Sequence, residues 1–410
     1  MKLAGKIAIF LILILFLFVL AAVVYNRFPE KSARLNQWNK VEQKREDDHL
    51  FERLENIGSR VNFEDRTTYD PLGMSENELN MILLQNGSAL ASFYALYHRD
   101  YTGVLTIESN HSRTYRLESH SDPVPNYRPW QNLVRLLILQ AHHHFINERE
   151  EQGLEALGAA SQLIQAMLQN PSMIELIMGL YQSNELNKYL VQSGRLYPEI
   201  CLSWIPDPAF IIESLDQALY CEFLLMENMI ESGETLQSMK SDQLGSAAVL
   251  FFNKEQSIGF LIENYRKHHQ CLEKSLLVQP QREPHFSKTN PWHWFSNPIG
   301  RILLDVGMPS FNSVNMNACL SIWMADATRL VLIRRNRHLE AGKDTTQALV
   351  KELNLVNPYG YQPYQVDQSG KLILLPKDDP LWKTFSVKQL SSLSAFPVVV
   401  PYPHPDDQRG

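Results

Sequence analysis

The chain has 410 residues, of which 44% are hydrophobic and 20% are charged, and its formal net charge is −7. This length can bury an ample core, and this composition is that of an ordinary globular protein, so wholesale disorder is excluded. The acidic balance argues against nucleic-acid partners, because neutralising phosphates needs a concentrated basic face that the sequence lacks.

Residues 1–28 predict a transmembrane anchor. No charged residue occurs from Ile7 to Tyr25, and as a helix at about 1.5 Å per residue this run covers the roughly 30 Å hydrocarbon core of a bilayer. The alternative is a cleaved signal peptide, since Lys2 and Lys6 precede the apolar run. We favour the uncleaved anchor, because the run is longer than a usual signal segment and residues 21–24 lead into no clean cleavage site.

The charges on the two flanks of this run disagree about its orientation. Lys2 and Lys6 favour a cytoplasmic N-terminus, whereas Arg27, Lys31 and Arg34 on the other flank favour the opposite arrangement. Short N-terminal tails of this kind usually stay inside. We therefore expect the body of the protein to lie outside the cytoplasm.

A polar stalk and linker is predicted over residues 29–74, and a helical body follows over residues 75–297. Ser75 and Glu78 have the spacing of a capping box, which predicts a helix over residues 76–97. Short β-like runs predict a hairpin or structured loop in an insertion near 101–128.

Hydrophobic periodicity predicts five further helices in the body, near 130–147, 150–169, 172–193, 208–231 and 243–278. The first two resemble a tetratricopeptide-type helical hairpin, in which small residues such as Gly153 and Ala156 let antiparallel helices approach closely. One such unit is visible, whereas an independent repeat array needs about three. We therefore expect the hairpin and not a repeat array.

Residues 298–396 are predicted to hold a long helix and a small β-hairpin segment. The helical pattern runs over 298–339 and is interrupted near 307–309, because a proline there cannot donate a hydrogen bond to the preceding turn. Asp344 is expected to cap a shorter helix that follows.

The stretch from Asn357 to Pro376 alternates prolines, glycines and tyrosines, which predicts a corner built of a turn and a hairpin. Residues 367–370 are expected to connect the hairpin strands, and the tyrosine rings to pack on a preceding helix. Asp378 and Asp379 are interpreted as a cap rather than a catalytic pair. A flexible tail is expected over residues 397–410.

This C-terminal arrangement resembles the end of a large set of mostly uncharacterised single-pass bacterial envelope proteins. The features are a long helix, a short capped helix, then Asn357–Pro358, Gly360, Pro363 and a hairpin. A shorter version of the turn occurs in major pseudopilins of type II secretion, although the prepilin cleavage motif is absent here. The resemblance covers roughly residues 298–376. It implies a location in the bacterial envelope and a similar fold, and it transfers no catalytic residue. Together with the predicted anchor, it leads us to expect a bacterial inner-membrane protein with a periplasmic body.

His268 and Cys271 are the candidate metal ligands. At positions i and i+3 of a helix they share one face, whereas consecutive residues such as those at 142–144 point about 100° apart and cannot converge on one ion. The alternative places these histidines at a helix surface or packing seam. The four cysteines are either buried thiols or include one disulfide, between Cys221 and Cys271.

Trp292, Trp294 and Phe295 lie between two prolines and predict a stiff aromatic loop, which we interpret first as filling the helical core. The alternative is that the loop lines a pocket, binds a partner or enters a membrane interface. Trp204 lies in a second loop with the same two interpretations. If the two loops meet in space, they would form a ligand groove.

The sequence contains no hydrolase elbow, phosphate-binding loop or dinucleotide-binding turn. We therefore expect a mainly α protein with an N-terminal transmembrane helix, a tetratricopeptide-like body, a small C-terminal β-hairpin appendage and no cofactor. Its expected function is non-enzymatic binding or scaffolding of other envelope proteins. The alternatives are a metal- or small-ligand-binding protein or enzyme, and an accessory component of a secretion or pilus-like system.

Overall fold

The computed structural model describes residue 19 and residues 50–63, 69–100, 128–169, 173–232, 252–277, 296–307 and 311–400. The predicted membrane anchor, apart from Val19, lies outside the described residues, as does most of the insertion near 101–128. These two expectations therefore stay predictions.

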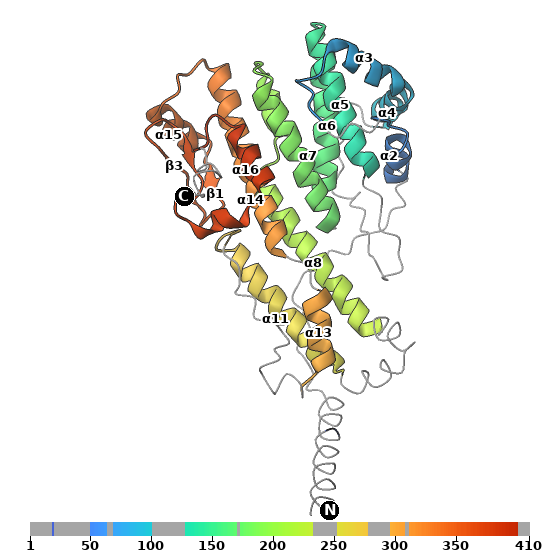
Figure 1. Ribbon diagram of the computed structural model, residues 1–410, viewed down its shortest axis with the longest axis vertical. Helices are drawn as coiled ribbons and strands as arrows, with labels where there is room; N and C mark the ends of the chain where they lie inside the picture. The colour runs from blue at the N-terminus through green and yellow to red at the C-terminus, as the bar shows by residue number, and fades with distance from the viewer. Residues whose placement is uncertain are drawn as a thin grey trace, which may run out of the picture.

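The described residues are mainly α-helical, as the hydrophobic periodicity predicted (Figure 1). The first helices are α2 (Leu50–Gly58), α3 (Glu76–Gln85), α4 (Gly87–Asp100), α5 (Arg128–Ile146), α6 (Glu150–Gln169) and α7 (Met173–Gln192). The 3₁₀ helix η1 (Glu199–Trp204), α8 (Pro208–Ser232) and α11 (Lys254–Leu272) follow. The remaining elements are α13 (Pro298–Gly307), α14 (Phe311–Asn336), α15 (Lys343–Glu352), β1 (Val356–Asn357), β2 (Gln362–Pro363), β3 (Gln365–Val366), β4 (Leu372–Ile373), the 3₁₀ helix η3 (Pro380–Thr384) and α16 (Val387–Ser394).

The predicted hairpin of two closely approaching helices is present as α5 and α6, which pack along each other. Gly153 permits this approach, since a Cβ added there would lie 2.4 Å from Cε1 of the Phe145 ring. Ala156 and Ala159 are fully buried in the same seam. Helices α5 to α8 each begin and end within two residues of their predicted bounds.

The helix predicted over residues 76–97 is two helices, α3 and α4. The capping box forms as predicted, with the Ser75 backbone N–H donating to Glu78 Oε2 at 2.9 Å. The break follows from Asn86, which is 1% exposed and exchanges two hydrogen bonds with the main chain of Asn62. Because this partner follows α2, the Asn86 side chain holds the loop after α2 and ends α3 at the same point.

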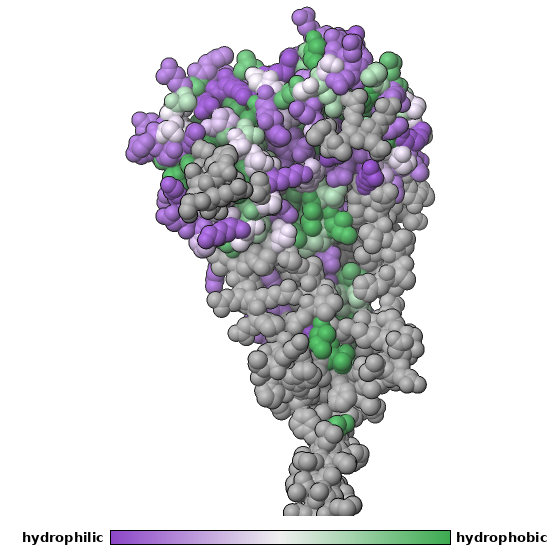
Figure 2. Space-filling view, in the orientation of Figure 1, coloured by the Kyte–Doolittle hydropathy of each residue, from purple (hydrophilic) through white to green (hydrophobic). Residues whose placement is uncertain are grey.

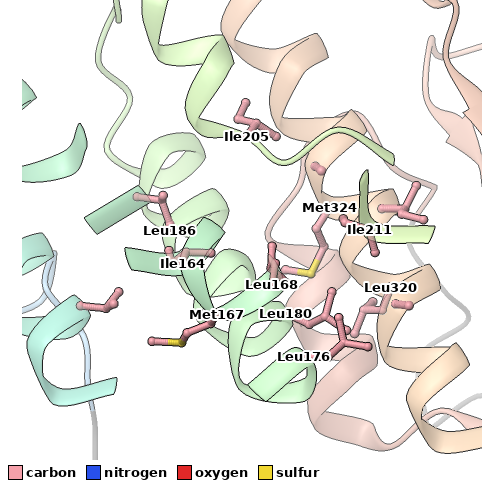
Figure 3. Packing of buried hydrophobic residues seen from close by; sticks show 14 of the residues in the cluster. Ile164, Met167, Leu168, Leu176, Leu180, Leu186, Ile205, Ile211, Leu320 and Met324 are labelled. Carbon is pink, nitrogen blue, oxygen red and sulfur yellow. The ribbon is translucent and has the colours of Figure 1, made fainter. Parts of the chain in front are cut away.

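Helix α14 lies at the centre of the fold and packs against α7 and α8. Figure 3 shows Leu168 of α6, Leu176 and Leu180 of α7, and Leu320 and Met324 of α14 lying together in this core. Within the described residues, the Ser313–Asn336 part of α14 is the one stretch long and apolar enough to cross a membrane, and 89% of its most apolar window is buried in the protein. Its apolar character is accounted for by the core.

Helix α13 ends at Gly307 and packs against α11, and α14 begins at Phe311. The residues between them, 308–310, lie outside the described residues, so the interruption predicted near 307–309 stays a prediction. The cap predicted for the next helix is wrong. Gly342 is the N-cap of α15, no side chain caps it, and Asp344 lies in its first turn, where a carboxylate interacts favourably with the helix dipole.

The stretch from Asn357 to Pro376 forms the predicted corner. Strands β3 and β4 pair antiparallel on either side of residues 367–370, and Gly370 has a φ of +84°, which glycine adopts without strain. Tyr364 reaches back to the central helix, where its hydroxyl donates to Asp326 at 2.8 Å. Tyr361 donates instead to the Leu272 carbonyl of α11. These contacts are structural, and they account for Tyr361 and Tyr364.

The flexible tail predicted over residues 397–410 is wrong for its first residues, 397–400, which are held in the fold. Val398 and Val399 are buried, the Leu372 N–H donates to the Val398 carbonyl at 2.6 Å, and the Val400 N–H donates to the Leu372 carbonyl at 3.0 Å. The chain after α16 thus pairs with β4, because Leu372 lies in a two-residue strand with an open edge. Residues 401–410 lie outside the described residues.

Candidate binding groove

A groove of about 990 Å³ lies between α7, α14 and the segment that holds η3 and α16. Helix α7 contributes lining residues between Ile177 and Lys188, α14 between Ser313 and Met324, and the C-terminal segment between Leu381 and Ser392. On the face shown in Figure 2, hydrophobic residues gather near the centre of the molecule, below a band of hydrophilic ones. A concave site with an apolar floor and a polar rim is the usual form of a binding site.

The floor of the groove is apolar and belongs to the core. Leu180, Leu320, Met324 and Phe385 line it and are each at most 6% exposed. Since these side chains also pack against the interior, an occupant would add apolar contacts on their outer side without opening the fold.

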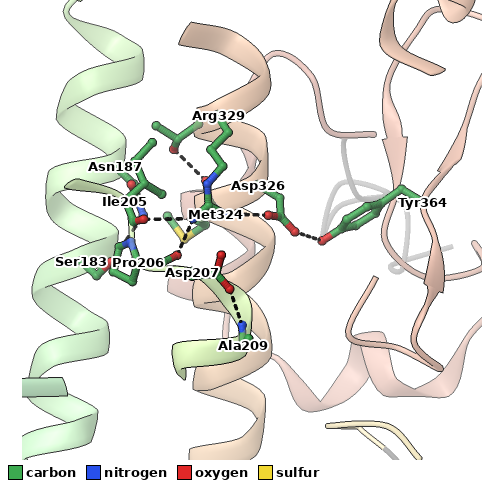
Figure 4. A network of polar contacts seen from close by, with 11 residues as sticks. Ser183, Asn187, Ile205, Pro206, Asp207, Ala209, Met324, Asp326, Arg329 and Tyr364 are labelled. Carbon is green, nitrogen blue, oxygen red and sulfur yellow. Dashed lines mark hydrogen bonds and ion pairs between the residues drawn. The ribbon is translucent and has the colours of Figure 1, made fainter. Parts of the chain in front are cut away.

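A buried polar network fixes the orientation of α14 about its own axis (Figure 4). This orientation presents Leu320 and Met324 to the groove. Arg329 Nη1 donates to Asp326 Oδ1 at 3.0 Å, and its Nη2 donates to the carbonyls of Ile205 at 3.0 Å and Pro206 at 2.8 Å. Asp326 accepts from Tyr364 on the opposite side. Burial raises the pKa of the Asp326 carboxyl to about 6, against the opposing effect of Arg329.

The end of α14 is tied to the end of α7. Arg335 Nη2 donates to the Val191 carbonyl at 2.7 Å and Nη1 to the Leu190 carbonyl at 3.5 Å. These are terminal carbonyls of α7, where a cation also interacts favourably with the helix dipole. The two longer walls of the groove are thereby fixed to each other beyond its end.

The third wall is fixed by a glutamine and by aromatic rings. Gln389 caps α16 through the backbone N–H of Ser386 at 2.8 Å, and its Nε2 donates to Asn317 Oδ1 on α14 at 2.7 Å. The Phe385 ring packs beside Trp323 and Trp382, with centroids 5.8 and 6.0 Å away. Helix α16 therefore sits on α14 in a defined position.

The rim holds cations on two walls. Lys388 Nζ of α16 lies 5.3 Å from the centroid of the Tyr181 ring on α7. Arg135 of α5 contacts the same ring, with Cζ 5.9 Å from its centroid and Nη2 donating to the hydroxyl at 3.4 Å. Lys188 lies two helical turns beyond Tyr181 on α7 and also lines the groove. Tyr181 thus joins α5, α7 and α16 at one edge.

Asn184 provides a polar group in the middle of the α7 wall. It lines the groove, and its Oδ1 has no hydrogen-bond partner among the described residues. A buried amide without a partner costs free energy that a donor from a bound molecule would recover.

The structure places the predicted metal ligands His268 and Cys271 in the last turns of α11, outside the groove. Within the part of the chain that the structure describes, no group of three or more His, Cys, Asp or Glu is arranged to hold a metal ion. The neighbouring His269 lies in the seam with α8, where its Nδ1 is 2.8 Å from Asp216 Oδ1.

Of the two predicted aromatic loops, the one with Trp292, Trp294 and Phe295 lies outside the described residues. Trp204 ends η1 and packs on α6: its indole lies 3.6 Å from the position a Cβ of Gly158 would take. Its carbonyl accepts a hydrogen bond from Ser161 at 3.0 Å. The Trp204 ring is partly buried and packs against the outside of the core, and it does not line the groove.

All four cysteines are free, so the disulfide considered between Cys221 and Cys271 is not formed. Cys201 and Cys319 are fully buried thiols. Burial raises the pKa of Cys201 to about 12 and that of Cys221 to about 11, which keeps both protonated and unreactive at neutral pH.

Sequence reasoning missed the groove residues. Lys188 and Asn184 are polar positions on a largely buried helix, but the same pattern fits a face turned to solvent. Lys388 and Met316 belong to no recognisable sequence motif. The groove arises from the tertiary packing of three distant segments, which local patterns do not encode.

A scan against protein-family models, a search of curated proteins and a search of solved structures each found no match to this chain.

Proposed function

We propose that this chain is a single-pass protein of the bacterial inner membrane whose periplasmic helical body is a non-enzymatic binding or scaffolding module. The uncharged run from Ile7 to Tyr25 supports the anchor. The resemblance of residues 298–376 to bacterial envelope proteins supports the location. The close packing of α5 on α6 supports a tetratricopeptide-like hairpin within the body.

The groove between α7, α14 and α16 carries the binding half of this proposal. Its floor is apolar, its rim is charged and its walls are fixed by partly buried hydrogen bonds, so little conformational entropy is lost when it is filled. Partner segments bind helical proteins in grooves of this form. The partners we expect are other envelope proteins.

Photo-crosslinking in cells tests this function. A benzophenone amino acid replaces Thr384 or Ser313, which are exposed and line the groove, or Glu213, which is exposed on α8 and does not line it. We expect the first two positions to give one shared adduct band that Glu213 does not give. Adducts of equal yield at all three positions, or none at Thr384 and Ser313, would contradict a binding function for the groove.

A further inference from the structure

The groove has the length of a short helix. Its lining spans twelve residues of α7, from Ile177 to Lys188, and twelve of α14, from Ser313 to Met324. Eleven residue steps along a helix cover roughly 16 Å, which is three turns. An amphipathic helix of that length could lie on the apolar floor and leave its polar face in water.

The floor suits the side chains of a helix. Met316, Leu320 and Met324 follow one another at intervals of four residues and line the groove from one face of α14. Methionine is unbranched and adapts to differently shaped partners, as at other helix-binding surfaces. Leu180 and Phe385 complete the floor from the other two walls.

The charges of the rim favour an acidic occupant. Lys188 and Lys388 stand on different walls, and neither forms an ion pair with any residue that the structure describes. Lys388 is held at the edge by the Tyr181 ring. Glu185 is the remaining charged residue of the lining, so the lining has one more cation than anion. Complementary charge on a partner would raise its association rate and select it over basic segments.

We infer that the groove takes a three-turn amphipathic helix of a partner protein, with acidic residues beside its apolar stripe. This inference rests on the proposed binding function. The apolar stripe of the helix lies on Leu320, Met324 and Phe385, and its carboxylates pair with Lys188 and Lys388. The amide of Asn184 accepts a hydrogen bond from a polar side chain of the helix.

The test is selection of a displayed library of random 15-residue peptides on the full-length chain in detergent micelles. We expect enriched peptides to place apolar residues at i, i+3 or i+4, and i+7, with Asp or Glu beside them. A K188E/K388E variant should bind them at least ten-fold more weakly in fluorescence anisotropy. The matched control is K343E/K377E, which makes the same charge change at two exposed lysines outside the groove and should bind normally.

A proline at the centre of a selected peptide separates a helical occupant from an extended one, because it breaks the helix. Loss of binding supports the helix, and unchanged binding overturns it.

Enriched peptides that are basic or uncharged, or that bind both double variants equally, overturn the acidic partner. If no peptide is enriched while Thr384 and Ser313 crosslink to a lipid or small molecule, the helical occupant is overturned and the binding function stands. If the crosslinks also fail, both are overturned.

Discussion

At the scale of single residues, Asp326 is the group whose titration should be visible in stability. It is 0% exposed, and burial raises its pKa from an ordinary value of 3.8 to about 6. The folded state therefore holds the proton more tightly than the unfolded state, and this contribution to stability is lost as pH rises through 6. Relative to D326N, which does not titrate, the wild-type chain should lose about 1.4 kcal/mol of unfolding free energy between pH 5 and pH 7.5.

Urea unfolding of the two chains in one detergent at both pH values measures this difference. D344N is the matched control, since Asp344 is exposed in the first turn of α15. The difference in unfolding free energy between D344N and the wild-type chain should not change by this amount between pH 5 and pH 7.5. The unfolding free energy of the wild-type chain minus that of D326N could instead stay constant, or increase toward pH 7.5. Either result would mean that Asp326 is ionised throughout this range and that its pairing with Arg329 outweighs its burial.

At the scale of elements, the α5–α6 hairpin depends on one missing methyl group. A Cβ at Gly153 would meet the Phe145 ring at 2.4 Å, and that ring is held by Arg195, whose Cζ lies 4.6 Å from its centroid. Overpacking of this kind costs about 1–3 kcal/mol, whereas alanine gains roughly 0.5–1 kcal/mol over glycine in a helix interior. G153A should therefore destabilise the chain by about 1–2 kcal/mol in urea unfolding at pH 7.5.

Gly158 gives a control in the same helix. A Cβ there would lie 3.6 Å from the Trp204 indole, which is an ordinary contact, so G158A should keep the gain in helix propensity and stabilise by roughly 0.5–1 kcal/mol. If G153A lowers the unfolding free energy and G158A raises it, the role of Gly153 is to allow close packing. The same sign for both would show that the Phe145 ring moves aside at little cost.

At the scale of the whole molecule, the sequence predicted what local periodicity encodes. Helices α5 to α8 follow an apolar stripe of their own residues, so their bounds were found closely. The end of α3 depends on Asn62, which is distant in sequence, and the pairing of Val399 with β4 joins strands too short to show alternation. The groove needs α7, α14 and α16 together. Its residues became identifiable when the tertiary fold placed Lys388 over Tyr181.

At this scale, the apolar run near the N-terminus and the apolar part of α14 have different environments. The stretch within α14 is 89% buried, so it is already satisfied by the core, whereas the run from Ile7 to Tyr25 is proposed to lie in the bilayer. The full chain should stay in the membrane pellet after alkaline carbonate extraction, and a chain that begins at Pro29 should be extracted. Intact mass should show residues 1–28 still attached to the membrane form, because a cleaved signal would release a lighter chain. Retention of the shortened chain in the pellet would instead place a second attachment in the body, and α14 would be the first helix to examine.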